Sequence, residues 1–209
     1  MSPLSPGYGE TPLEPDEADA LTPVARALLG DDPLRADVYD VEQAVSDEVS
    51  FEFANAVIDG RVGLSDLLTD AFVRELHRRL YGDIWTWAGV YRRTEKSVGI
   101  DPVKIAVELR QSLETIAYRW EHTDDWSPRE LGIAVHAEVV RIHPFVDGNG
   151  RVTRLLADLV FFAAQDAGEL LFTYDWGVDK RPYIDLLREY DRSRDPVSLA
   201  AFVPVVAVS

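Results

Sequence analysis

Several stretches of the chain repeat their apolar residues at helical spacing, and these stretches predict the main elements. A short helix is expected over residues 16–29, and a longer one runs from near Asp37 to the turn at Asp59-Gly60. Steps of four place five apolar residues of this second helix on one buried face and leave its opposite face acidic. These residues are Val41, Val45, Val49, Phe53 and Val57.

Capping residues predict where the next helices begin. Thr69 opens a helix that Gly82 stops, and Asp101, followed by proline, opens another. Ser127 begins a third with a capping box. The third helix carries His143 at its C-terminal end.

The remaining elements complete the expected fold class. A helix after the glycine-rich turn is apolar around almost its whole circumference, which is typical of the centre of a bundle. Two short helices follow at 182–192 and 197–202. Residues 90–100 place β-branched and aromatic residues around a polar turn and predict a hairpin. The sequence therefore indicates an all-α fold with one small β-hairpin.

Composition divides the chain into three parts. Residues 1–15 hold four prolines and two glycines, which predicts an irregular arm. Residues 16–68 form N-terminal helices to which we assign a regulatory role as a hypothesis. Residues 69–209 form the core domain.

Charge and residue usage exclude several classes of function. The chain has 37 acidic and 21 basic residues and a formal charge of −16, so nucleic acid and anionic membranes are not expected partners. The absence of cysteine excludes disulfides, thiolate zinc sites and a cysteine nucleophile. The N-terminus lacks a secretory signal and no stretch is long and apolar enough to span a membrane, so a cytoplasmic location is expected.

Residues 143–154, HPFVDGNGRVTR, gather a base, a carboxylate, a flexible turn and two guanidinium groups. Two glycines flank Asn149 just before the apolar helix, so backbone N–H groups there are free to face an anion. Arg151 and Arg154 share one face of the first helical turn, where the helix dipole disfavours cations unless an anion compensates them. The segment therefore predicts a phosphate cradle.

Two other residues of this segment supply reactive groups. Asp147 offers the hard oxygen ligands that Mg²⁺ selects when it binds one carboxylate, substrate phosphates and water. His143 can accept a proton near neutral pH, as activation of a hydroxyl nucleophile requires. Each residue alone has an ordinary structural explanation, such as pairing of the arginines with Asp158, but none explains their joint order. The other histidines, His77, His122 and His136, are expected to be structural.

The segment matches, at every specified position, the signature of the Fic/Doc family, whose members typically transfer AMP from ATP to a protein hydroxyl. The resemblance includes residues 76–89, LHRRLYGDIWTWAG, and covers roughly 69–202. Gly148 resembles the AMP-transferring branch, since the phosphorylating Doc branch has alanine there and lysine two residues later. Residues 9–18, GETPLEPDEA, resemble the branch called mobile mystery protein B, which implies a bacterial protein.

The resemblance implies a role for each position of the motif. His143 is the general base for a target Ser, Thr or Tyr, Phe145 anchors the loop in the core, and Asp147 binds Mg²⁺. The phosphate-binding residues it implies are Gly148, Asn149 and Gly150 as the anion hole, Arg151 for the inner phosphates and Arg154 for the γ-phosphate.

Family members also carry a flap that pins a target segment by strand addition beside the active site. The candidate region here is residues 91–100. Its candidate docking residues are Tyr91, Arg92, Val98 and Gly99.

Many family members are held inactive by a helix with the motif Ser or Thr, three residues, Glu, then Gly or Asn. The nearest segments here are VYDVEQ, which keeps Glu42, and NAVIDG, which has Asp59 in place of the glutamate. Either carboxylate could pair with Arg154 and exclude the γ-phosphate. Self-inhibition and control by a separate antitoxin chain are both open at this point.

The hypothesis is a protein adenylyltransferase that uses ATP and Mg²⁺, with a hydroxyl-bearing target protein as partner and its oligomeric state, monomer or homo-oligomer, open. One alternative is removal of AMP, or transfer of UMP or phosphate, by the same loop. Another is a non-catalytic nucleotide-binding protein with a regulatory or antitoxin-like role.

Overall fold

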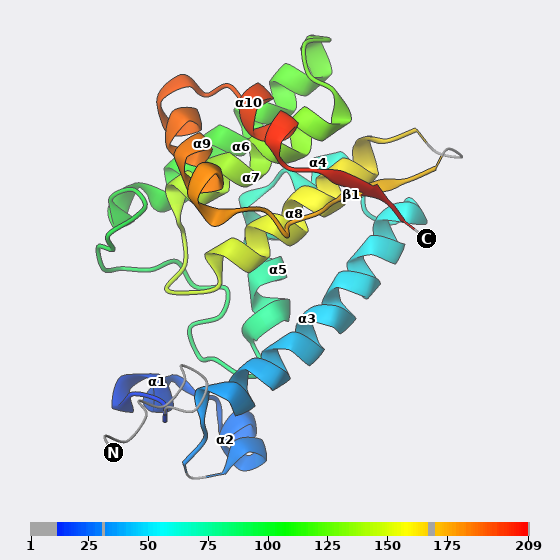
Figure 1. The fold of residues 1–209 in the computed structure, drawn as a ribbon. Coiled ribbons are helices and arrows are strands. Elements are labelled where there is room, and N and C mark those ends of the chain that lie inside the picture. Colours follow the sequence, from blue (N-terminus) through cyan, green and yellow to red (C-terminus); the bar gives the residue numbers. More distant parts are fainter. Residues whose placement is uncertain (1–11, 31, 167–169, 209) are drawn as a thin grey trace, which may run out of the picture.

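The computed structural model describes residues 12–30, 32–166 and 170–208, and these are mainly helical (Figure 1). The expected fold class is confirmed. Most of the predicted arm, residues 1–11, lies outside the described residues, and its end at Pro12 pairs with Leu34 in an isolated β-bridge.

The N-terminal helical region contains two helices where the sequence predicted one. They are α1 (Pro15–Ala20) and α2 (Pro23–Leu29). The break arises because Thr22 precedes a proline, adopts an extended conformation and caps α2 through the amide of Ala25 at 3.1 Å. Leu21 pairs with Trp85 in a β-bridge, which ties this region to the segment after α5.

Helix α3 (Arg35–Ile58) confirms the long helix predicted from near Asp37. In Figure 1 it runs diagonally from α1 and α2 towards the main helical body, and it packs on α5 (Asp70–Tyr81) and α8 (Asn149–Ala164). Of its five predicted apolar positions, Val49 and Val57 are buried and the others are partly buried. A short helix, α4 (Leu64–Leu67), connects α3 to α5.

The centre of the body is the antiparallel pair α7 (Pro128–Ile142) and α8, which have the most extensive contact in the fold. The capping box at Ser127 is present: its hydroxyl accepts the amide of Glu130 while that carboxylate accepts the amide of Ser127. A 3-10 turn, η2 (Pro102–Lys104), leads into α6 (Ile105–His122), which packs on α7.

The sheet is formed by the C-terminal part of the chain. Strand β1 (Phe172–Tyr174) pairs antiparallel with β2 (Val205–Ala207), and α9 (Lys180–Ser193) and α10 (Val197–Phe202) lie between them in sequence. The hairpin predicted at 90–100 is wrong, because this segment contains no strand. Its backbone amides at Arg92 and Ile100 donate instead to Pro144 and Ile142 beside the end of α7.

None of the helices that the structure describes has both the length and the apolar character needed to cross a bilayer.

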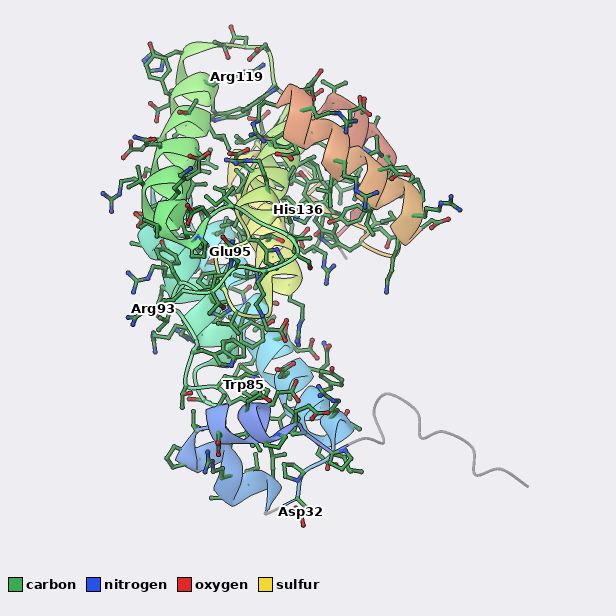
Figure 2. All side chains as sticks on the ribbon, turned by 90° about the vertical axis from the view of Figure 1, so that its left-hand side faces the viewer. Asp32, Trp85, Arg93, Glu95, Arg119 and His136 are labelled. Atoms are coloured by element: carbon green, nitrogen blue, oxygen red, sulfur yellow. The ribbon has the colours of Figure 1, made fainter. Side chains whose placement is uncertain are left out.

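Two histidines are buried in the core. His136 on α7 lies inside the helical body (Figure 2), with Nε2 2.5 Å from the hydroxyl of Tyr183 and, among the described residues, no hydrogen-bond partner for Nδ1. Burial lowers the pKa of His136 to about 3 and that of His77 to about 4. Both rings are therefore neutral in the folded protein at neutral pH.

We expect the free energy of unfolding to fall as the pH is lowered from about 6.5 to 4. In this window the unfolded chain protonates His77 and His136 while the folded protein does not, so the unfolded state binds more protons and acid favours it. Asp158 has the opposite effect on the free energy of unfolding below pH 6, because burial raises its pKa to about 6 and the folded protein then binds the extra proton. This single carboxyl group is outweighed by the two histidines. Urea titrations at three pH values measure the effect.

The control is His122, which is exposed. His136→Phe should reduce the pH dependence of the free energy of unfolding, and His122→Gln should leave that pH dependence unchanged. A protein that is equally stable at pH 4.5 and 7 would contradict the assignment.

Candidate active site

The site forms where α7 ends and α8 begins. His143 is the C-cap of α7, in a left-handed conformation (φ 53°), and its amide donates to Val139 O at 2.9 Å. Its side chain is half-buried. Burial, followed by the charge of Arg92, lowers the pKa of His143. The imidazole is therefore neutral near pH 7 and can accept a proton.

Arg92 fastens the segment after α5 to the end of α7. It is 2% exposed, and its guanidinium donates to the carbonyls of His143 at 2.7 Å, Thr94 at 2.9 Å and Ile100 at 2.5 Å. The carbonyls at the C-terminal end of α7 carry partial negative charge, which compensates the buried cation. The side chain of Arg92 therefore has a structural role, because it joins this segment to the end of α7. It is buried, so it is not available as the docking residue that the sequence predicted.

The other predicted docking residues divide into two groups. Tyr91 is half-buried, with its hydroxyl 3.4 Å from Asp70 Oδ2. Val98 is 55% exposed, and Gly99 has a φ of 97° and packs so closely that a Cβ there would lie 2.6 Å from His143 Cβ. Residues 93–99, which include Arg93 and Glu95 of Figure 2, are exposed and end beside His143.

The loop between the helices is held by an asparagine and a phenylalanine. Asn149 is 3% exposed; its Oδ1 accepts the amide of Phe145 at 2.9 Å and its Nδ2 donates to Phe145 O at 3.0 Å. The Phe145 ring is fully buried, in agreement with the anchoring role that the resemblance implied. The Asn149 side chain thus shapes the loop, and its backbone is what faces the site.

Two amides at the start of α8 are free to bind an anion. Gly148 is the N-cap with φ 74°, and the amides of Asn149 and Gly150 donate to no acceptor among the described residues. At Gly150 a Cβ would meet only Arg154 Nη1, 3.8 Å away, so space exists beside these donors. These amides lie where the sequence predicted an anion hole, and their role in binding an anion stays a prediction.

Asp147 presents its carboxylate to solvent beside these amides. Its Oδ1 accepts the amide of Gly148 at 2.7 Å, and the residue is exposed. Its carbonyl accepts from His77 Nε2 at 3.1 Å, while His77 Nδ1 accepts the amide of Gly89 at 2.9 Å and the ring stacks on Phe145 at 3.7 Å. His77 therefore positions the carboxylate-bearing loop, a role that sequence analysis missed although the residue lies inside the family-like segment 76–89.

In the part of the chain that the structure describes, no group of three or more His, Cys, Asp or Glu side chains could hold a metal. A Mg²⁺ ion at Asp147 would have one protein carboxylate, with phosphate oxygens and water as its other ligands, which fits the usual donor set of Mg²⁺.

The two motif arginines differ in their partners. Arg151 Nη2 lies 2.5 Å from Glu42 Oε2, and Glu42 Oε1 accepts from Trp85 Nε1 at 2.7 Å. Glu42 is 4% exposed, so this carboxylate from α3 is buried in contact with α8. Arg154, by contrast, makes no ion pair or hydrogen bond with any described residue.

These contacts correct two predictions, for Glu42 and Asp59, and do not support the alternative pairing of the arginines with Asp158. Glu42 pairs with Arg151 and not with Arg154, because the first half of α3 lies over the first turn of α8. Asp59 pairs with Arg61 at the far end of α3 and contacts neither motif arginine. Asp158 is bonded by Thr173 Oγ1 at 2.8 Å and by Trp176 Nε1 at 3.0 Å, so it does not neutralise the arginines.

Two cavities of about 390 Å³ each lie beside the Glu42–Arg151 pair. Glu42 and Asp147 line one, together with Lys96 of the exposed segment. Arg151 and Arg154 line the other. The ion pair therefore lies between a space lined by Asp147 and a space lined by Arg154.

Comparison with known proteins agrees with this geometry. The sequence profile described as the Fic/DOC family matches residues 67–161, which include the whole site loop. Over this segment the chain is similar to the Fic/DOC family. Its match to protein adenylyltransferase Fic of Drosophila melanogaster is 32% identical over 125 residues and covers 56% of this chain and 24% of the relative, so the chain spans about a quarter of that protein's length.

Solved structures show the same fold. The Fic domain of a Bep effector from Bartonella quintana superposes with a TM-score of 0.59 at 16% identity and covers 80% of each chain. BepC of Bartonella tribocorum, with bound AMPPNP, has a TM-score of 0.58 at 16% identity and covers 84% of this chain and 89% of that one.

Asn149→Ala should lower the free energy of unfolding by about 2–3 kcal/mol, because it leaves the buried amide and carbonyl of Phe145 without partners. Urea denaturation measures this. The matched control is Asn55→Ala, at the chain's other asparagine, whose side chain makes no described hydrogen bond. Equal stability of the two variants would show that the loop does not depend on the Asn149 side chain.

Proposed function

We propose that this Fic domain is a protein adenylyltransferase, which transfers AMP from ATP to a Ser, Thr or Tyr hydroxyl of a target protein. The observation that carries the proposal is the placement of a neutral His143 next to two free amides and an exposed carboxylate. The D. melanogaster relative named as an adenylyltransferase and the AMPPNP-bound BepC support a nucleotide as the phosphate donor.

His143 would remove the proton of the target hydroxyl as that oxygen attacks the α-phosphorus. The new P–O bond forms as the bond to the β-phosphate oxygen breaks, and pyrophosphate leaves. The amides of Asn149 and Gly150 would stabilise the charge on the α-phosphate oxygens, because a helix N-terminus provides preorganised donors. Positioning and charge stabilisation account for most of the catalysis expected in such a site.

Asp147 is the residue that would hold Mg²⁺, and bound Mg²⁺ would neutralise phosphate charge. Arg151 would contact the inner phosphates after leaving Glu42, and Arg154, which has no partner among the described residues, would contact the outermost one. These local cations are needed because a chain of formal charge −16 repels ATP at long range. Nucleotide binding should therefore depend on Mg²⁺.

The target would approach along residues 93–99. This segment is exposed and ends at Gly99 against His143. Its main chain is held by the hydrogen bonds of the buried Arg92 side chain. An extended peptide of the target could add to its backbone, a recognition mode in which main-chain hydrogen bonds give the affinity.

Residues 16–68 would regulate the site through Glu42. Its carboxylate occupies Arg151, which is the guanidinium needed for the inner phosphates, so the structure corresponds to a self-inhibited form under this proposal.

His143→Ala should reduce AMP transfer at least a hundredfold while leaving ATP affinity within about threefold of wild type. Purified protein, Mg²⁺ and ATP labelled on the α-phosphate are incubated in bacterial lysate, and labelled protein bands are quantified. Label from the γ-phosphate but not the α-phosphate would indicate phosphate transfer instead. Label that persists in the His143→Ala variant would contradict the base assignment, and calorimetric ATP binding separates loss of binding from loss of chemistry.

Glu42→Gln should raise ATP affinity and AMP transfer several-fold, because the amide keeps an acceptor for Trp85 but releases Arg151. The control is Asp59→Asn, which removes a charge at the far end of the same helix without touching the motif arginines and should change neither quantity. Weaker ATP binding in Glu42→Gln than in Asp59→Asn would refute self-inhibition by this contact.

A further inference from the structure

The last residue of α5, Tyr81, buries a hydroxyl without a hydrogen-bond partner. The residue is 2% exposed, and its oxygen has no partner among the described residues. A buried hydroxyl without a partner is unfavourable, and phenylalanine would fill the same space without that cost. Tyr174, which is equally buried, shows the usual arrangement, since its hydroxyl donates to Arg129 O at 2.6 Å.

The unpartnered hydroxyl lies at the anion hole. A Cβ at Gly148 would be 2.5 Å from the Tyr81 ring and 2.8 Å from its oxygen, so the phenol packs directly on the turn that begins α8. The guanidinium of Arg151 lies over the ring, 5.2 Å from its centroid. A ligand held by the first amides of α8 and by Arg151 would therefore be adjacent to the Tyr81 hydroxyl.

The charges around the hydroxyl come from three elements. Glu42 belongs to α3, Asp147 to the loop, and Arg151 and Arg154 to α8, and all four act electrostatically on Tyr81. Burial raises the pKa of Tyr81, so the phenol stays protonated and can donate a hydrogen bond. An acceptor oxygen with negative charge is the partner that this donor lacks.

We propose that Tyr81 is a phosphate-binding residue, whose hydroxyl donates to an inner phosphate oxygen of the nucleotide held by the first amides of α8 and Arg151. The inference rests on the nucleotide site of the proposed function and adds a donor that the motif does not contain. Arg151 covers the phenol while it is paired with Glu42. When an anion draws Arg151 away from Glu42, the same movement gives the ligand access to the hydroxyl.

The test compares Tyr81→Phe with Tyr174→Phe in calorimetric titrations of inorganic pyrophosphate with Mg²⁺ and of ATP with Mg²⁺. Tyr81→Phe should weaken both ligands about tenfold, the effect typical of a lost hydrogen bond to a charged group. Tyr174→Phe should retain wild-type affinity, because its hydroxyl bonds to the start of α7, at the end opposite His143.

Thermal unfolding of the ligand-free variants gives a second, independent readout. Tyr81→Phe should melt at or above the wild-type temperature, since it removes a hydroxyl without a partner, whereas Tyr174→Phe should melt below it. Unchanged pyrophosphate affinity in Tyr81→Phe would overturn the proposal. A melting temperature lowered as much as in Tyr174→Phe would also overturn it, because the hydroxyl would then have a structural partner.

The experiment separates this inference from the proposed function. Tyr81-dependent pyrophosphate binding without AMP transfer would support the phosphate contact and count against adenylyltransferase activity. AMP transfer by the wild-type protein, together with unchanged ligand affinity in Tyr81→Phe, would support adenylyltransferase activity and count against the phosphate contact of Tyr81. A wild-type protein that binds neither pyrophosphate nor ATP would overturn both.

Discussion

The site depends on the short loop in which the chain reverses direction between α7 and α8. This loop buries polar main-chain groups, and each of them needs a hydrogen-bond partner. His143 and Gly148 both adopt left-handed backbone conformations, and the Asn149 side chain satisfies both main-chain groups of Phe145, which lies between them. The backbone amide of Asn149 itself donates to no acceptor among the described residues, and Asn149 is the first residue of α8. His143, the carboxylate of Asp147 and the two free amides thus share one loop, so under the proposed function the same residues would serve both folding and binding.

Under the proposed function, electrostatics restrict the groups that can bind an anion at this site. A protein of formal charge −16 disfavours anions at long range, so binding must come from short-range groups. Those groups are two amides, Arg154, which has no partner among the described residues, and Arg151, which is paired with Glu42. The buried carboxylate of Glu42 neutralises Arg151 in the structure, because removing both charges from water is tolerable only when they pair. This links the N-terminal helices to the chemistry of the loop.

Several predictions failed where the deciding partner was distant in sequence. The segment 90–100 has strand-forming residues, but its amides bond to the end of α7, and Arg92 donates to the carbonyl of His143, 51 positions away. The strands that do pair are separated by α9 and α10, so no local pattern marks them. The prediction of one helix over 16–29 failed for a different reason, which is local. The helix divides because Thr22 precedes Pro23, and the hydrophobic pattern alone does not resolve this break.

By itself, the sequence determined the helical class, the capped starts of α5 and α7, and the order of reactive groups in HPFVDGNGRVTR, because spacing, capping and motif order are local properties of the chain. Only the tertiary structure decided which arginine meets Glu42, that Asp59 lies apart from the site, and that His77 and Tyr81 pack against the loop. These contacts depend on where α3 and α5 lie relative to α8, and helix packing in three dimensions, not periodicity along one helix, sets that position.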